Sequence, residues 1–298
     1  MRYPKVFIII LNHNGKDVLP DCLNSVLHSD YPTKEVVVVD NDSTDLSFEK
    51  AKKLFDKFHF IKNNRNKGFA AGNNVAIRWA LEKMADYVFL LNNDAVIGKD
   101  SLKKMIESAE KDARGGIFSP IIYKGKTDQI WFGGGKIDWM RMRTVHVISN
   151  KRQEKRAIKN SIFSWHISRT TDYVTGCAML IKKDVFKKIG LLDEDYFLYY
   201  EDADFSYRAK KAGFGLKIVS EAKAYHLEKS SENPNKIYWL VYSGLIFFKK
   251  NTPWFWRPWV VFYTLLRKIK NKKKMKNKEK YAVDVKRAFE DFKKEKRA

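Results

Sequence analysis

The sequence predicts an α/β fold in which a mostly parallel central sheet is flanked by helices. Two apolar runs of strand length, residues 6–11 and 35–39, are rich in β-branched side chains and lack the polar alternation of a half-exposed strand. Between them, residues 18–27 carry apolar side chains at helical spacing. A strand, a helix and a second strand in this order predict neighbouring parallel strands joined by a right-handed crossover.

The same patterns continue along the chain to about residue 226. Further strands are predicted at residues 60–61, 87–91, 117–122, 174–181, 214–219 and 224–226. Further helices are predicted at residues 47–58, 69–83, 99–111, 183–189 and from Glu201 to about residue 211. Between residues 123 and 170 the periodicity fades, and no element is assigned there.

The composition favours an anionic partner. The formal net charge is +23, and residues 267–298 hold 15 Lys or Arg against 5 Asp or Glu. Such a balance suits nucleic acid, anionic lipid or a phosphorylated substrate. The two cysteines, Cys22 and Cys177, match no metal-ligand spacing, which favours a reducing compartment. The apolar run near the N-terminus ends at Asn12 and is too short to span a bilayer, so we expect a cytoplasmic protein.

From about residue 233 the chain changes character. Residues 237–248 carry no charge, and residues 254–259 hold four aromatic side chains, after which residues 267–280 are almost wholly basic. Neither apolar run reaches the roughly 20 residues that span a bilayer. We expect a helical extension that lies on an anionic membrane surface at the inner face of the cell membrane. The alternative is a pair of core-packed helices with a solvated tail. Nucleic acid is not expected, because no recognition motif is present.

Polar side chains stand where four of the predicted strands end, or just after such an end. They are Asp40-Asn41, Asn92-Asn93-Asp94, Glu201-Asp202 and His226. Taken alone, the carboxylates at 201, 202 and 204 are explained as the acidic first turn of a helix, and residues 43–45 as a helix cap. Together, carboxylates and a histidine at several strand ends are what a divalent metal with a diphosphate ligand requires.

At these residues the sequence resembles the family 2 glycosyltransferases, inverting enzymes of the GT-A fold, and in particular their rhamnosyltransferase-like branch. The motifs that carry the resemblance are residues 38–45, 66–74 and 90–94, residues 201–204 with Arg208 and Gly213, and His226 with Ser230. The resemblance implies a GT-A catalytic domain over residues 1–232. Its nucleotide-sugar half spans about 1–98 and its acceptor half about 99–232, and a C-terminal extension follows over 233–298.

The resemblance also implies a role for each matching position. The donor nucleotide is expected to contact Asn12, Asn14, Asp40, Asn41, Asn66, Gly68, Asn73, Asn92 and Asn93. Asp94 and His226 are expected to hold Mg²⁺ or Mn²⁺, although the family's Asp-x-Asp is here Asn92-x-Asp94 and lacks its first carboxylate. The acceptor is expected near Gly176, Glu201 and Trp131, and Trp165 is a second tryptophan able to stack on a sugar; core packing explains both tryptophans equally well.

Asp202 is expected to be the catalytic base of a single displacement that inverts the anomeric carbon, with Glu201 positioning Asp202 or the acceptor. Asp204 and Arg208, four residues apart on one helix, are interpreted as a structural ion pair. The sequence thus predicts transfer of a sugar from a UDP- or dTDP-linked donor, with dTDP-rhamnose among the candidates. The expected acceptor is a hydroxyl of a saccharide or lipid-linked saccharide in cell-surface glycan synthesis.

Two other functions compete with this prediction. A processive polysaccharide synthase shares the catalytic half, but it carries a Gln-x-x-Arg-Trp motif, and neither Gln129 nor Gln153 begins one. A catalytically degenerate protein that binds nucleotide-sugar or anionic lipid without turnover is the other alternative, and Asn92 is the residue that favours it.

Overall fold

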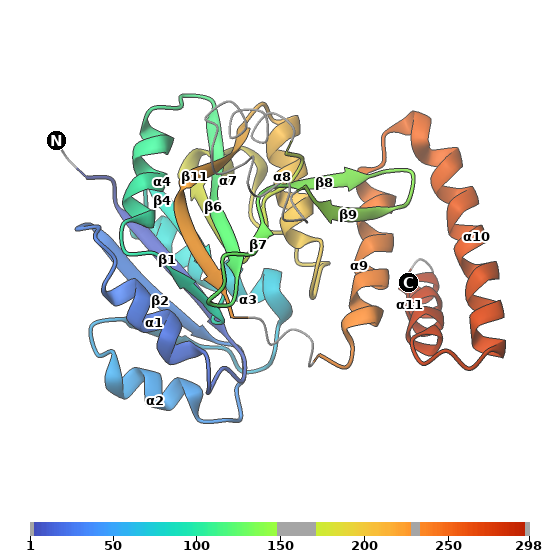
Figure 1. The fold of residues 1–298 in the computed structure, drawn as a ribbon, viewed down its shortest axis with the longest axis horizontal. Coiled ribbons are helices and arrows are strands. Elements are labelled where there is room, and N and C mark those ends of the chain that lie inside the picture. The colour runs from blue at the N-terminus through green and yellow to red at the C-terminus, as the bar shows by residue number, and fades with distance from the viewer. Residues whose placement is uncertain (1–2, 148–170, 228–232, 296–298) are drawn as a thin grey trace.

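The structure is a computed structural model that describes residues 3–147, 171–227 and 233–295. Its centre is a nine-stranded sheet with the order β3-β2-β1-β4-β10-β6-β11-β5, to which β7 is added beside β6. Helices flank this sheet, and the last three helices form a separate group at one end of the molecule (Figure 1). The predicted α/β class is confirmed.

The first half of the sheet is parallel. β3 (His59–Lys62), β2 (Lys34–Asp40), β1 (Val6–Asn12) and β4 (Tyr87–Leu91) lie side by side with the same direction. The apolar residues of β1, β2 and β4 are almost all buried because helices cover the sheet, as the continuous apolar runs predict, whereas those of the edge strand β3 are only partly buried. The register places Asn12 opposite Asp40, so the polar residues that follow β1 and β2 gather at one edge.

The second half of the sheet is mixed, which corrects the prediction of a mostly parallel sheet. β10 (Ala178–Lys182) runs antiparallel to β4 and to β6 (Gly115–Lys124). β11 (Gly215–His226) is parallel to β6, while β5 (Ala95–Ile97) and β7 (Ile130–Phe132) pair antiparallel with β11 and β6. A strand buried on both faces is apolar whichever way its neighbours run, so composition alone does not reveal direction. The two strands predicted at 214–219 and 224–226 are one strand, β11, whose register shifts between Val219 and Lys223.

The helices of the α/β region follow the predicted spacing, with small changes at their ends. They are α1 (Leu19–Leu27), α2 (Ser47–Leu54), α3 (Gly68–Glu82), α4 (Ser101–Glu110), α7 (Lys183–Ile189) and α8 (Glu201–Lys211). Pro20 occupies the first turn of α1, where its missing N–H costs no helical hydrogen bond. α2 ends four residues earlier than predicted.

A hairpin outside the main sheet was not predicted. β8 (Gly135–Asp138) and β9 (Arg143–His146) form a two-stranded antiparallel sheet within the stretch that showed no periodicity. The hairpin reaches toward the C-terminal helices (Figure 1). Trp259 Nε1 donates a hydrogen bond of 2.9 Å to the carbonyl oxygen of Met140 at its tip.

The C-terminal extension is helical, as predicted. It comprises α9 (Lys236–Asn251), a short 3-10 helix (Trp254–Trp256), α10 (Arg257–Lys276) and α11 (Ala282–Glu295). α9 adds Ile246, Phe247 and Phe248 to the same core that contains the sheet, and α11 packs on the other side of α9. None of the helices in the described ranges is both long and apolar enough to cross a membrane.

Candidate active site

A cavity of about 1000 Å³ lies at the edge of the sheet where β1, β2 and β4 end. Most of the residues predicted for the site line it: Asn14, Asn41, Asn66, Gly68, Asn92, Asn93, Asp94, Trp131, Gly176, Glu201, Asp202 and His226. These residues come from sequence positions as far apart as 14 and 226, so the fold brings the predicted motifs into one place. A second cavity of about 460 Å³ beside β3 contains none of them.

Three predicted donor residues are fully buried and do not line the cavity. Asn12 Nδ2 donates a hydrogen bond of 2.8 Å to Ser47 Oγ, and Asn12 Oδ1 accepts one of 2.9 Å from Asn93 Nδ2. Asp40 Oδ2 accepts from the backbone N–H of Ser43, and Asn73 donates to the carbonyl of Phe69 within its own helix. In this structure Asn12 and Asp40 therefore hold the loops that form the cavity, Asn73 bonds within α3, and the contact of all three with a nucleotide stays a prediction.

Asn41 joins the end of β2 to the loop before α3. Its Nδ2 donates to Asn66 Oδ1 at 2.9 Å and to the Gly68 carbonyl at 3.1 Å, while its Oδ1 accepts from the Lys67 N–H at 3.1 Å. Gly68 has a φ of +76°, and a Cβ atom there would lie 2.3 Å from the carbonyl oxygen of Phe197. Only glycine fits this position, which keeps the loop backbone at the cavity wall.

Asp94 and His226 meet at the floor of the cavity. His226 Nε2 lies 3.3 Å from Asp94 Oδ2, and the two side chains are only 5% and 17% exposed. Asp94 Oδ1 and His226 Nδ1 are buried and have no hydrogen-bond partner among the described residues. Buried polar atoms are almost always paired in native proteins, so these two atoms suggest a ligand that the protein alone does not supply.

A carboxylate oxygen and an imidazole nitrogen fit Mg²⁺ or Mn²⁺, and the residues present are compatible with such an ion. They do not form a complete metal site, since no cluster of three or more His, Cys, Asp or Glu side chains able to hold an ion occurs within the described residues. Asn92, which replaces the first carboxylate of the motif, also lines the cavity. The remaining coordination positions would fall to oxygens of a bound ligand.

Glu201 and Asp202 occupy the first turn of α8 and face the cavity. Asp202 is half-buried; its Oδ2 accepts a hydrogen bond of 3.0 Å from the Gly176 N–H and its Oδ1 one of 2.7 Å from the Ala203 N–H. Burial raises the pKa of the Asp202 carboxyl above its usual value, although these backbone donors oppose the shift. A carboxylate with a raised pKa is a stronger base than an exposed one.

Glu201 lies beside Asp202 and is more deeply buried, with 5% of its surface exposed. Its Oε2 has no hydrogen-bond partner among the described residues. Burial, together with the negative charge of Asp202, raises the pKa of Glu201 well above its usual range. Of this pair, Glu201 is therefore the carboxyl that keeps its proton more readily.

The backbone that leads into α8 is strained. Tyr199 and Tyr200 have φ angles of +66° and +70°, in the left-handed region that non-glycine residues rarely adopt. Each residue in this conformation costs about 1–3 kcal/mol of conformational free energy, and the conformation persists only where the surrounding structure holds it. The two tyrosines turn the chain so that the first residues of α8 open into the cavity. Nothing in the sequence signals this turn, because it contains no glycine.

His146 lines the cavity and was missed by sequence analysis. It stands at the end of β9, and its Nδ1 lies 2.7 Å from the carbonyl oxygen of Trp131. A carbonyl only accepts hydrogen bonds, so Nδ1 carries the proton and Nε2 is left as an acceptor. Burial lowers the pKa of His146 and keeps it neutral. The preceding stretch had no periodicity, which is why no signal pointed to it.

Trp131 lines the cavity, and its contact with an acceptor stays a prediction. The ring of Trp131 lies against His226, with ring centres 4.4 Å apart, so it covers the Asp94–His226 pair. Trp165 lies outside the described residues, as does Ser230. Trp239 of α9 lines the cavity instead and stacks on Phe197 at 4.5 Å. The C-terminal extension therefore forms part of the cavity wall.

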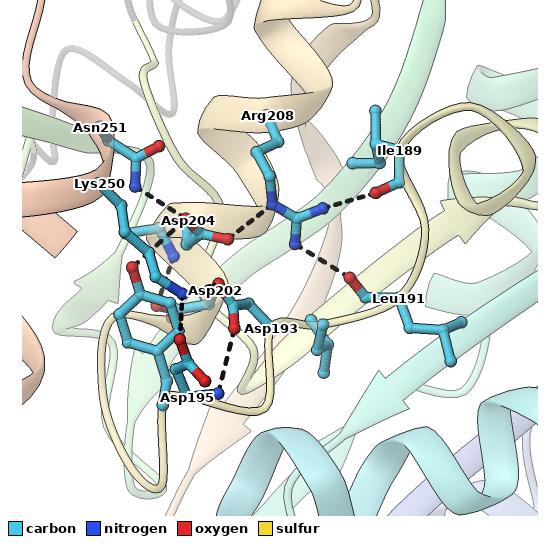
Figure 2. A network of polar contacts seen from close by, with 12 residues as sticks. Ile189, Leu191, Asp193, Asp195, Asp202, Asp204, Arg208, Lys250 and Asn251 are labelled. Carbon is cyan, nitrogen blue, oxygen red and sulfur yellow. Dashed lines mark hydrogen bonds and ion pairs between the residues drawn. The ribbon is translucent and has the colours of Figure 1, made fainter. Parts of the chain in front are cut away.

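Asp204 and Arg208 form the structural ion pair that their spacing predicts, which Figure 2 shows. Arg208 Nε donates to Asp204 Oδ2 at 2.7 Å, and the guanidinium also donates to the carbonyls of Ile189 and Leu191. Asp204 is 2% exposed and points away from the cavity lining. Arg208 thus fastens α8 to the end of α7 and to the segment that follows it.

Comparison with known proteins identifies similar chains. The model of the family described as Glycosyl transferase family 2 matches residues 7–190. The chain is 26% identical over 232 residues to the dTDP-rhamnosyl transferase RfbF of Shigella flexneri, covering 72% of this chain and 71% of that protein. It is 23% identical over 203 residues to an N-acetylglucosaminyl-diphospho-decaprenol L-rhamnosyltransferase of Mycobacterium tuberculosis, covering 64% of this chain and 66% of that one.

Among solved structures, the mannosyltransferase PcManGT from Pyrobaculum calidifontis, in complex with GDP-Man and Mn²⁺, has a similar fold. The TM-score is 0.62 at 15% sequence identity, and the match covers 85% of this chain and 66% of that one. At this identity the likeness shows the fold alone, which is the GT-A fold.

Proposed function

The chain belongs to glycosyl transferase family 2, and we propose that it transfers a sugar from a nucleotide diphosphate donor to a hydroxyl group with inversion at the anomeric carbon. One observation carries the proposal. A charged, half-buried carboxylate, Asp202, shares a single cavity with the Asp94–His226 pair and with the asparagine loop at the end of β2. A base, a site for a diphosphate and a site for a nucleotide thus open into the same space.

We propose a UDP- or dTDP-linked sugar as the donor, with dTDP-rhamnose as the first candidate. Two rhamnosyltransferases are similar to most of the chain, and one of them is named for dTDP-rhamnosyl transfer. The nucleotide is expected against Asn14, Asn41, Asn66 and Gly68, which line one side of the cavity. Side-chain amides there can pair with both donor and acceptor atoms of a pyrimidine base.

In the proposed reaction, Asp202 accepts the proton of the acceptor hydroxyl as its oxygen attacks the anomeric carbon. The new carbon–oxygen bond forms on the face opposite the diphosphate, whose bond to that carbon breaks, so the nucleoside diphosphate leaves and the configuration inverts. Protonated Glu201 can donate a hydrogen bond that holds the acceptor or Asp202. Asp94 and His226 would hold Mg²⁺ or Mn²⁺, which when bound supplies positive charge to the leaving diphosphate.

The acceptor is proposed to be a saccharide or a lipid-linked saccharide, with the enzyme docked on the inner face of the cell membrane. The support is one face of α10 and of the short helix before it. Trp254, Val261, Leu265 and Ile269 are each more than half exposed there. The last three are spaced four residues apart and therefore lie on one stripe, which continues at the same spacing to Lys273.

An apolar stripe that ends in lysines fits an anionic bilayer, into whose interface the apolar side chains insert while the lysines meet lipid phosphates. A second copy of the chain fits less well. Parallel pairing of two stripes would bring two clusters of Lys272, Lys273 and Lys276 together, and antiparallel pairing would give neither cluster an anionic partner on the facing stripe. We therefore propose the anionic leaflet as the partner of this face, named here the α10 stripe (Trp254, Val261, Leu265 and Ile269).

The function is tested by screening UDP- and dTDP-sugars for transfer and for thermal stabilisation, with and without Mn²⁺. Specific binding to the folded state raises the melting temperature by mass action. Stabilisation by one donor class together with release of its nucleoside diphosphate supports the proposal. Stabilisation with no release would favour the degenerate nucleotide-sugar binder that Asn92 suggests. No effect of any donor would contradict both.

A further inference from the structure

We propose that α9 positions the catalytic carboxylate, with Ser243, Gly244 and Asn251 as positioning residues. The inference rests on the proposed role of Asp202 as the base. It assigns a positioning role to a helix that lies after residues 7–190, the part of the chain that the family model matches. The evidence is that α9 contacts the strained turn before α8 and also α8 itself, at three separate points.

The first two contacts hold the turn. Ser243 is fully buried, and its Oγ donates a hydrogen bond of 2.7 Å to the carbonyl oxygen of Leu198, the residue before the two left-handed tyrosines. One residue later, Gly244 lies against the ring of Tyr200. A Cβ atom at Gly244 would stand 3.3 Å from two ring carbons and from the hydroxyl oxygen of Tyr200, which is tighter than ordinary packing. Glycine thus lets α9 approach the turn closely enough to confine Tyr200.

The third contact holds α8 directly, and Figure 2 shows it. Asn251 Nδ2, at the end of α9, donates to Asp204 Oδ1 at 2.8 Å, while Arg208 binds the other oxygen of the same carboxylate. The neighbouring Lys250 pairs with Asp193 at 2.6 Å and Asp195 at 2.5 Å. α9 therefore fixes both the helix that carries Asp202 and the loop that precedes it.

The loop before α3, which is proposed to bind the nucleotide-sugar, also contacts the turn before α8. The Phe69 N–H donates a hydrogen bond of 2.7 Å to the carbonyl of Phe197, beside the close approach of Gly68. Because the two supports are separate, a change in α9 should move Asp202 without changing the asparagine loop. The expected signature is a loss of kcat with little change in the KM for the donor.

The test measures amide hydrogen exchange and kinetics on the full chain, on Ser243→Ala and on Ser101→Ala as matched control. Ser101 is also buried, and its Oγ donates a hydrogen bond of 2.9 Å to the carbonyl of Lys223, away from the cavity. Each variant thus removes one buried serine hydrogen bond to a carbonyl, and Ser101→Ala also removes the hydrogen bond of 2.9 Å that its Oγ accepts from the Lys223 N–H. Ser243→Ala should speed exchange of amides 197–203 about tenfold, since one such bond changes a local opening equilibrium by about that factor.

The same variant should lower kcat by about ten- to a hundredfold, the cost of misplacing a catalytic group by about 1 Å. The acid limb of its pH–rate profile should shift to lower pH, because water that reaches Asp202 lowers the pKa of that carboxyl toward its ordinary value. Ser243→Thr, which keeps the hydroxyl, should restore both kcat and the pH profile. Gly244→Ala should reproduce the loss of kcat by pushing the Tyr200 ring, and it replaces Ser243→Ala if that variant fails to fold.

Unchanged exchange over residues 197–203 in Ser243→Ala would overturn the proposal. A second result would also overturn it: Ser243→Ala exchanges faster over these residues, but its kcat and pH profile equal those of Ser101→Ala. In that case α9 would stabilise the fold without positioning Asp202. If the unaltered chain transfers no sugar, the proposed function fails. In that case the exchange comparison still decides whether α9 holds the turn.

Discussion

The backbone N–H of Gly176 donates a hydrogen bond of 3.0 Å to Oδ2 of Asp202, although 26 residues separate them in the chain. The bond ties the segment before β10 to the first turn of α8. It also lets a neutral backbone donor share the charge of a carboxylate in a partly dry cavity. This donor opposes the effect of burial, which raises the pKa of the Asp202 carboxyl.

Asp202→Asn should abolish transfer while nucleotide binding persists. The amide cannot accept the acceptor proton, and loss of a general base costs about 10²- to 10⁴-fold in rate. Steady-state kinetics and thermal shift with UDP or dTDP measure the two effects. Asp56→Asn, an exposed position outside this cavity, is the matched control and should behave like the unaltered chain. Undiminished transfer by Asp202→Asn would remove Asp202 from the mechanism.

Glu201→Gln should make the protein more stable at neutral pH but not in acid. The raised pKa of buried Glu201 means that its contribution to stability is complete below the unfolded pKa of about 4.3 and is lost as pH rises toward the folded pKa. Glutamine mimics the protonated form and escapes this loss. The melting temperature should rise by about 2–4 °C at pH 7 for each kcal/mol recovered. At pH 4 it should match that of the unaltered chain.

The control for this experiment is Glu107→Gln, an exposed position on α4. It should leave the melting temperature unchanged at both values of pH, because the Glu107 side chain is exposed in the folded chain and its replacement removes no buried group. If the rise in melting temperature of Glu201→Gln persists undiminished at pH 4, its cause is packing and not the ionisation of Glu201.

His226→Ala should remove the metal-dependent part of nucleotide binding. If His226 and Asp94 hold the ion, the additional stabilisation that Mn²⁺ gives to a nucleoside diphosphate should fall by most of its value, while binding without metal changes little. His28→Ala, which removes an exposed histidine directly after the end of α1, serves as control. An undiminished Mn²⁺ effect in His226→Ala would exclude His226 as a ligand.

The double variant Val261→Asp/Leu265→Asp should release the full chain from vesicles that contain anionic lipid. Both side chains lie on the α10 stripe, and aspartate both resists insertion and repels lipid phosphates. Co-sedimentation with neutral and with phosphatidylglycerol-containing vesicles measures the effect, and we expect a loss of at least tenfold in the bound fraction on anionic vesicles.

Leu54→Asp is the control for the vesicle experiment, since Leu54 is 71% exposed on α2, far from the stripe in the chain. It should bind vesicles like the unaltered chain. Equal binding by the double variant would contradict the membrane proposal. Concentration-dependent dimerisation that the double variant abolishes would instead identify the stripe as an interface between two copies.

Local patterns in the sequence predicted the parallel half of the sheet, the helices around it and the polar positions at the strand ends. These features are local because burial on both faces, helical spacing and strand-end chemistry each appear within a few consecutive residues. The Asp204–Arg208 pair was predictable for the same reason, since one helical turn fixes its geometry.

Contacts between distant segments decided the rest. The antiparallel place of β10, the cavity position of His146 and the approach of Gly244 to Tyr200 each depend on segments far apart in the chain. The left-handed Tyr199–Tyr200 turn contradicts local preference and persists because α9 and the Gly68 loop enclose it. The sequence by itself thus predicted a set of site residues, most of which line the cavity. Tertiary packing alone decided how they are held, because strain at a site is supported by the surfaces around it.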